Sequence, residues 1–551
     1  MAIQSQNVLE EKKKKLAGKS IFFAAWGAAN KNDSLYQNWY LPLKKMVKQA
    51  IVFDAGQEYF REGKEKMNKK FLKRVEEIKP DYIFFNLMYD EFELSTLKKL
   101  RKISPKTILV NIFSDDDWRF DNYSRYYSLF MDYALTCHDV RAEYARDGQQ
   151  KAVFFMATNC EHFRPIDEKR IYDVVFFGKP NPSRIELMQL LIKKGIAFHL
   201  WGEGWERYPE FREYYHGYLP AEELVRVINQ SKIVLGFTMG GYGKPQIKGR
   251  PFEVAACKSF ILVEHYEKYL DFFRKEKEIV MFKDTEELIE KIQYYLKHEK
   301  EREEIAAAAY KKVIASHNQP KEIEKFLLGT LDKKPSQWEL PPVQGRYAIL
   351  SASDLAQPQK IIEDKLKGAE YVTFATDNTN HSLRYYFQAY ALEKSGKEIS
   401  CCDYYVSKPF LHNYLLFKSQ VAFQKLSYHE FHNTLDISQL MVRKKYFLEH
   451  LDEVKNLHSA NVLNKENTVF ISIPLVTLHD FRAADRKVFE SVFQMKFLDS
   501  LYSLYARRRI FISFYPYALL IHAAIRKTYI FGIIRNALKD AKKLSKLKEA
   551  H

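Results

Sequence analysis

The most informative part of the sequence is the stretch Gly249-Arg-Pro-Phe-Glu-Val-Ala-Ala-Cys257, which is followed by the apolar run Phe260-Ile-Leu-Val-Glu264. A loop that contains glycine leads into Pro251, and proline suits the first turn of a helix. The start of a helix presents unpaired N–H groups and the positive end of the helix dipole, so it suits a phosphate. A carboxylate there, Glu253, can accept hydrogen bonds from a ribose diol, as in dinucleotide sites. The stretch predicts a helix start that could hold a sugar nucleotide, although an ordinary helix after a loop has the same pattern.

A second pattern lies upstream, where the apolar run Asp173-Val-Val-Phe-Phe177 leads into the turn Gly-Lys-Pro-Asn-Pro-Ser-Arg184. Such a run is typical of a buried strand. Further elements are predicted as a helix over 185–194, a strand-containing segment over 197–205, a helix over 221–230, and strands at 233–237 and 278–282. Asp284 and Glu287 have the spacing of a capping box for the next helix.

The order of these motifs resembles the nucleotide-sugar-binding half of GT-B glycosyltransferases, and in particular the CgeB-like, spore-maturation-type family. The resemblance covers roughly residues 105 to 320. One residue, Lys258, departs from the family, which usually has glycine at this position.

The resemblance implies a donor site that holds a diphosphate without a metal, by means of basic side chains and helix N-termini. Glu253 is the expected ribose ligand. The other residues expected in the donor site are Gly178, Lys179, Ser183, Arg184, Trp205, Lys248 and Arg250. Each basic side chain also fits a solvated surface charge, and Trp205 also fits a core position.

The N-terminal part of the chain repeats the alternation of short apolar runs with helical patterns. Strands are predicted at 21–25, 51–53, 82–85, 107–113 and 152–155, with helices such as 68–78 and 94–103 between them. This alternation predicts a parallel sheet with helices on both faces. We therefore expect an α/β fold in which two Rossmann-like domains face each other across a cleft, the GT-B arrangement, with ligand at the carboxyl ends of the strands.

Candidate catalytic residues follow two strands of this N-terminal part. The segment Phe113-Ser-Asp-Asp-Asp-Trp118 has three consecutive carboxylates, and the resemblance points to Asp115 or Asp116. Repulsion among them can raise one pKa and suit it to base catalysis. His138, after another strand, could contact the acceptor or a donor phosphate. The alternatives are a solvated acidic turn that caps a helix and a structural histidine.

Composition limits the remaining choices. The chain has 551 residues, a net charge of +17 and five cysteines without metal-ligand spacing, which fits a reducing cytoplasm. The short apolar run 21–25 is a better first strand than a signal peptide. No nucleic-acid-binding motif accompanies the positive charge, so we expect no nucleic-acid partner.

The C-terminal part begins after a proline-rich linker at 331–345. Residues 346–500 weakly resemble a family-2-type GT-A glycosyltransferase whose metal-binding acidic cluster is reduced to Asp377, and one carboxylate is a weak site for a hard cation. We therefore expect a degenerate, smaller module, either α/β or mostly helical. Residues 501–551 combine apolar and basic residues, which predicts either a tail on an anionic membrane or a docked helix.

These observations together predict an N-terminal acceptor-side domain over 1–165 and a nucleotide-sugar-binding domain over 166–330. The predicted function is transfer of a sugar from a nucleotide-sugar donor to a cell-surface polysaccharide, glycolipid or glycoprotein. It needs no cofactor beyond the donor. The predicted location is the cytoplasm, either free or peripheral on the inner face of the cell membrane. The alternative is a non-catalytic scaffold that docks partner enzymes at the membrane, which the departure at Lys258 and the depleted cluster at Asp377 favour.

Overall fold

The computed structural model describes residues 2–478, except for 32, 89–90, 150, 240–244, 336–339, 341–342, 376–378, 381–382, 407–414, 418–439 and 456–466. Asp377 and the tail 501–551 lie outside the described residues, so what the sequence predicts for them stays a prediction. No helix in the described part of the chain is long and apolar enough to cross a membrane.

The first sheet contains six parallel strands in the order β2-β1-β3-β4-β5-β6. These are β1 (Ser20–Ala25), β2 (Gln49–Asp54), β3 (Tyr82–Asn86), β4 (Ile108–Phe113), β5 (Tyr133–Thr136) and β6 (Ala152–Phe154). The helices of this part are α1 (Ala2–Ala17), α2 (Leu41–Met46), α3 (Ala55–Glu62), α4 (Lys64–Ile78), α5 (Leu94–Ile103), α6 (Asp116–Arg119), α7 (Arg125–Ser128) and α8 (Arg141–Arg146), with π-helical turns η1 (Tyr36–Tyr40) and η2 (Phe120–Ser124). The central strands β3 and β4 are buried at every residue and mostly apolar, as expected of parallel strands that are covered on both faces.

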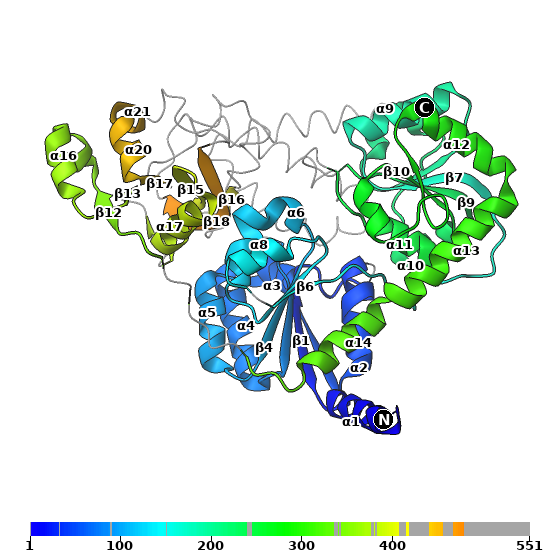
Figure 1. Cartoon of the computed structure of the whole chain (residues 1–551), viewed down its shortest axis with the longest axis horizontal. Helices are drawn as coiled ribbons and strands as arrows, with labels where there is room; N and C mark the ends of the chain where they lie inside the picture. Colours follow the sequence, from blue (N-terminus) through cyan, green and yellow to red (C-terminus); the bar gives the residue numbers. More distant parts are fainter. Residues whose placement is uncertain are drawn as a thin grey trace, which may run out of the picture. The chain divides into compact units, whose positions relative to one another are not determined.

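The second sheet contains five parallel strands in the order β11-β10-β9-β7-β8. These are β7 (Tyr172–Phe177), β8 (His199–Trp201), β9 (Ser231–Gly236), β10 (Ile261–Glu264) and β11 (Val280–Phe282). The helices are α9 (Pro182–Lys193), α10 (Ala221–Asn229), α11 (Arg250–Ala256), α12 (Thr285–Lys297) and α13 (Glu299–Ser316). Alternate strand residues face opposite cores: Val175 packs with residues of α10 and α11, whereas Val174 packs with residues of α9 and α12. The ribbon of the second sheet and its surrounding helices is shown in Figure 1.

The two Rossmann-like parallel sheets expected from the sequence are therefore confirmed. In the second sheet the chain moves from β7 to β8 at one edge and then returns to β9 on the other side of β7. Such a reversal leaves a crevice outside the carboxyl ends of the strands, where ligands of open α/β sheets bind. A ligand site is therefore expected at the turns after β7 and β9.

The third sheet is mixed, with the order β12-β13-β17-β15-β18-β14 and with β16 paired to β15. Its strands are β12 (Tyr347–Leu350), β13 (Tyr371–Phe374), β14 (Thr379–Asn380), β15 (Ile399–Val406), β16 (Leu415–Phe417), β17 (Leu440–Arg443) and β18 (Thr468–Leu478). Its helices are α15 (Ala352–Leu355), α16 (Gln359–Lys365), α17 (Arg384–Ser395), α20 (Lys444–Glu449) and α21 (Leu451–Lys455). Of the two expected architectures for this region, the described residues have the α/β one.

One helix does not pack where the expected domain limits place it. Helix α14 (Gln319–Thr330) belongs to the segment 166–330, yet it buries Ile323 and Leu327 in the core of the first sheet. The Tyr82 and Thr330 hydroxyls lie 3.2 Å apart. An apolar helix stripe predicts that a helix is packed, but it does not say against which sheet.

Candidate functional site

The turn after β7 is built on close contact between two backbone segments. Gly178 has a φ of +154°, and a Cβ atom on it would lie 2.9 Å from the Phe176 ring. Gly202, with a φ of +130°, leaves still less room, since its Cβ would lie 2.4 Å from the Gly178 carbonyl oxygen. Only glycine fits both positions without strain. Gly178 thus shapes the predicted donor site through its backbone.

Arg184 lies over this turn. Its backbone N–H donates to the Asn181 side chain at 2.9 Å, which caps α9, and its Nη1 donates to the Lys179 carbonyl at 2.8 Å. The guanidinium also lies over the Phe176 ring, 5.3 Å from its centroid. Its Nε is buried and has no hydrogen-bond acceptor among the described residues. Burial lowers the pKa of Arg184, while nearby Glu264 opposes that shift. A buried N–H without an acceptor is costly, so an anionic ligand there would stabilise it.

Helix α11 begins at Arg250, with Pro251 in its first turn as the sequence predicts. Arg250 Nη1 lies 2.9 Å from Glu253 Oε2, and the guanidinium packs over the Phe177 ring at 5.2 Å. Nη1 is buried and makes no well-aligned hydrogen bond with a described residue. Because α11 spans seven residues, side chains rather than a long helix dipole would have to supply most of the positive potential.

Lys248 lies between the donor-side cations and the carboxylates that follow β4. Its ammonium contacts the side-chain oxygen of Gln246, and its backbone N–H donates to the Tyr269 hydroxyl at 3.0 Å. Burial lowers the pKa of Lys248; Asp115 opposes this shift and the positive charge of Arg184 adds to it. The positive charge of Arg184 therefore acts on the ammonium of Lys248.

Asp116 does not fit the predicted role of an accessible base. Its side chain is 0% exposed and accepts hydrogen bonds from the Ser124 hydroxyl at 2.5 Å and the Tyr144 hydroxyl at 2.6 Å. Burial raises the pKa of Asp116 to about 6, partly offset by these two donors. The cause is thus burial rather than the expected repulsion among neighbouring carboxylates. Asp116 holds the turn together, while Asp115 begins α6 at its N-cap.

The third carboxylate, Asp117, was not singled out from the sequence. Gln246 Nε2 donates to both of its oxygens, at 3.0 and 3.1 Å, and His138 Nε2 lies 3.5 Å from Oδ1. His138 is 9% exposed, and burial lowers the pKa of its imidazole more than Asp117 and Asp115 raise it. The predicted His138 thus lies beside a carboxylate. The sequence of three consecutive aspartates does not indicate which of their side chains lies next to His138.

Three other residues predicted for the donor site make contacts within the protein instead of presenting a buried cation to a ligand. Trp205 is wrong as a pocket residue: it is fully buried among Phe176 and Phe211, and its indole N–H donates to the Gly178 carbonyl at 2.7 Å. The Lys179 side chain is 74% exposed and pairs with Glu203 at 3.1 Å. The Ser183 hydroxyl donates to the Asn181 side chain at 2.9 Å, within the cap of α9.

Glu264 is a further residue of this region without a predicted role. It ends β10 and accepts hydrogen bonds from the Thr238 N–H and hydroxyl and from the Met239 N–H, at 2.8, 2.9 and 3.2 Å. It thereby fixes the turn that follows β9. The sequence does contain a signal for this role: an acidic residue at the end of an apolar strand needs hydrogen-bond donors when it is shielded from water.

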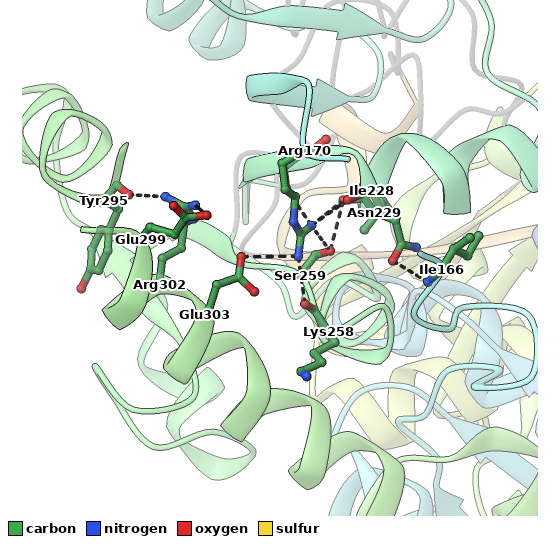
Figure 2. A network of polar contacts seen from close by, with 11 residues as sticks. Ile166, Arg170, Ile228, Asn229, Lys258, Ser259, Tyr295, Glu299, Arg302 and Glu303 are labelled. Carbon is green, nitrogen blue, oxygen red and sulfur yellow. Dashed lines mark hydrogen bonds and ion pairs between the residues drawn. The ribbon is translucent and has the colours of Figure 1, made fainter. Parts of the chain in front are cut away.

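The residue that departs from the family, Lys258, keeps the backbone conformation that glycine favours. Its φ is +53°, in the left-handed region, directly after α11. Figure 2 shows how the guanidinium of Arg170 braces this turn, with Nη2 donating to the Lys258 carbonyl at 3.2 Å. Nη1 donates to the Asn229 carbonyl at 2.9 Å and to the Ser259 hydroxyl at 2.8 Å. The turn therefore forms without glycine.

Comparisons with known proteins agree with this arrangement of motifs. Residues 184–327 match the family model described as glycosyl transferase-like. The spore protein CgeB of Bacillus subtilis (strain 168) is 21% identical over 271 residues, which cover 45% of this chain and 83% of that protein.

Solved structures similar to this chain include Anabaena Alr3699/HepE in complex with UDP, with 11% identity, a TM-score of 0.43 and coverage of 57% of this chain and 99% of that one. Another is sucrose-phosphate synthase from Thermosynechococcus elongatus, with 13% identity, a TM-score of 0.41 and coverage of 57% and 98%. The sequence matches confirm the resemblance to CgeB over part of the chain, and residues 184–327 match the glycosyl transferase-like family model.

Proposed function

We propose that this chain transfers a sugar from a nucleotide-sugar donor to a cell-surface polysaccharide, glycolipid or glycoprotein. The glycosyl transferase-like family and fold support the reaction class. The donor would lie at the turns after β7 and β9, with Glu253 on the ribose. Its diphosphate would lie against Arg184, Lys248 and Arg250.

The observation that carries this proposal is the buried Nε of Arg184, which has no hydrogen-bond acceptor among the described residues, whereas Arg250 already pairs with Glu253. Arg184 Nε and Arg250 Nη1 are buried N–H groups without an aligned acceptor in the described part of the chain. A diphosphate supplies several anionic oxygens, and Arg holds such groups through charge-assisted hydrogen bonds. Three cationic side chains can also offset the charge that develops on the leaving diphosphate. We therefore propose that the reaction needs neither a metal nor another cofactor.

On the other side of the site we propose that Asp115, Asp117 and His138 contact the acceptor. Burial keeps the imidazole of His138 in its neutral form at pH 7, because its pKa lies below the ordinary value. A neutral imidazole beside a carboxylate can accept a proton from an acceptor hydroxyl. The cytoplasm is the proposed location, and five free cysteines are in keeping with a reducing compartment.

The test is titration calorimetry with nucleoside diphosphates, beginning with UDP because Alr3699/HepE was solved with UDP. Glu253→Ala should weaken binding by roughly 1.5–3 kcal/mol, the scale of a charge-assisted hydrogen bond. Glu253→Gln, which keeps an acceptor oxygen, should lose less. Unchanged affinity in Glu253→Ala would remove this residue from the site.

A screen of nucleotide sugars for hydrolysis, with and without EDTA, separates the enzyme from the scaffold alternative. Turnover that is insensitive to EDTA would support the proposal. Diphosphate binding without turnover of any donor would favour a non-catalytic scaffold, and turnover abolished by EDTA would contradict metal independence.

A further inference from the structure

A surface away from the proposed donor site combines exposed apolar and basic side chains. Helix α1 buries Leu16 in the core of the first sheet, but Val8 and Leu9, nearer its start, are 54% and 43% exposed. Helix α14 packs beside α1 on the same sheet (Figure 1). About half of each of these two aliphatic side chains is therefore open to solvent.

An open groove of about 400 Å³ lies between these two helices. We call it the α1–α14 groove; Leu9 lines it together with four lysines and one acid, which are Lys12, Lys13, Lys321, Lys325 and Glu324. Leu328 of α14 faces the groove as well, so aliphatic and basic side chains line it from both helices.

Only part of this positive charge is balanced nearby. Lys13 pairs with Glu324 at 3.2 Å, and Lys325 lies 3.6 Å from Glu322. Lys12 and Lys321 form no ion pair with a carboxylate of the described residues. Their ammonium groups remain available to an external anion.

A bilayer surface with anionic lipids matches both halves of this pattern. Lysine stems lie along apolar surface while their ammonium groups reach phosphates, and aliphatic side chains enter the boundary between headgroups and acyl chains. A nucleic acid would use the lysines but not the aliphatic side chains. A duplex binds through its phosphates, and a single strand also stacks its bases on aromatic side chains rather than on valine or leucine. The exposed Val8 and Leu9 favour the lipid.

We propose that the α1–α14 groove, with Val8 beside it, binds the surface of an anionic phospholipid membrane. This contact is separate from the C-terminal tail and does not depend on the donor site. It would hold the first sheet against the membrane through peripheral contact.

The test is sedimentation of the full chain with vesicles of phosphatidylglycerol and phosphatidylcholine at low salt. The triple variant Lys12→Ala/Lys321→Ala/Lys325→Ala should lower the partition coefficient on the order of 100-fold, since each lysine near an anionic surface contributes about 1 kcal/mol. The control removes three exposed lysines of α4, Lys66→Ala/Lys69→Ala/Lys73→Ala, and should change partitioning less than about threefold. Circular dichroism confirms that each variant is folded.

A second variant tests the apolar half of the surface. Val8→Ser/Leu9→Ser should also reduce vesicle binding, and this loss should persist at high salt because it is not electrostatic. The proposal is overturned if the full chain ignores the vesicles, if both triple variants bind equally, or if the serine variant binds as the wild type does. A different result would assign the groove to a nucleic acid instead: no binding of vesicles, together with binding of a duplex oligonucleotide that is lost in the lysine variant and unchanged in the serine variant.

Discussion

The turn after β7 and the turn after β4 differ in how far their polar side chains are hydrogen-bonded to described residues. After β7 and β9, Arg184 and Arg250 keep buried N–H groups without an aligned acceptor. After β4, Asp116 already accepts two short hydrogen bonds, and Asp117 accepts two from Gln246. A buried N–H without an acceptor gains from an anionic ligand, whereas Asp116, whose carboxylate already accepts two hydrogen bonds, stabilises the turn after β4. This difference supports the proposal that the donor diphosphate lies against the turns after β7 and β9.

The largest expected effect concerns Trp205, which lies in the second sheet's core below the binding turn. Trp205→Ala should lower the free energy of unfolding by about 3–5 kcal/mol, because it leaves a large cavity and an unpaired Gly178 carbonyl. Denaturant titration measures this loss. Trp205→Phe keeps most of the volume and should lose less. A Trp205→Ala protein of normal stability that fails to bind UDP would restore this residue as a ligand contact.

The next effect concerns Asp116 and the first sheet. The pKa of Asp116 is raised from 3.8 to about 6, so the folded chain binds this proton more tightly than the unfolded chain. The stability it contributes is fully present below pH 4 and is lost as the pH rises through 6, by about 3 kcal/mol. Asp116→Asn should remove this part of the pH dependence, which urea titrations between pH 4 and 7 would show. An unchanged pH profile in the variant would mean that another group titrates there.

The smallest effect concerns Lys258, at the end of α11. Lys258→Gly should raise the free energy of unfolding by about 0.5–1 kcal/mol, because glycine adopts a positive φ without steric cost. Lys258→Ala keeps the Cβ atom and should stay close to the wild type. Urea midpoints distinguish the two variants. Destabilisation by glycine would show that the lysine side chain itself supports the turn.

Local sequence patterns predicted the two parallel sheets well. Buried parallel strands are continuous apolar runs, and the helices between them have their own periodicity, so each element is recognisable by itself. Helix α5 spans Leu94–Ile103 as expected, and α11 has Pro251 in its first turn, as predicted. The predicted capping residue Asp284 accepts from the Glu286 and Glu287 N–H groups.

What the sequence did not predict depends on contacts between distant segments. Asp117 and Gln246 are 129 positions apart, so no local pattern joins them. Helix α14 returns to the first sheet, although its apolar stripe would fit either one. Trp205 has a large apolar surface that suits a pocket and a core equally, and only packing decides between them.

The central claim is that the buried cations of the second sheet bind the donor diphosphate. Titration calorimetry with UDP on Arg184→Gln, with the exposed Lys179→Gln as its matched control, tests this claim most directly. Arg184→Gln should weaken UDP binding by about 1.5–3 kcal/mol, or roughly 10- to 150-fold, while Lys179→Gln should change it less than about threefold. Equal affinities of wild type and Arg184→Gln, or no diphosphate binding by the wild type, would contradict the account.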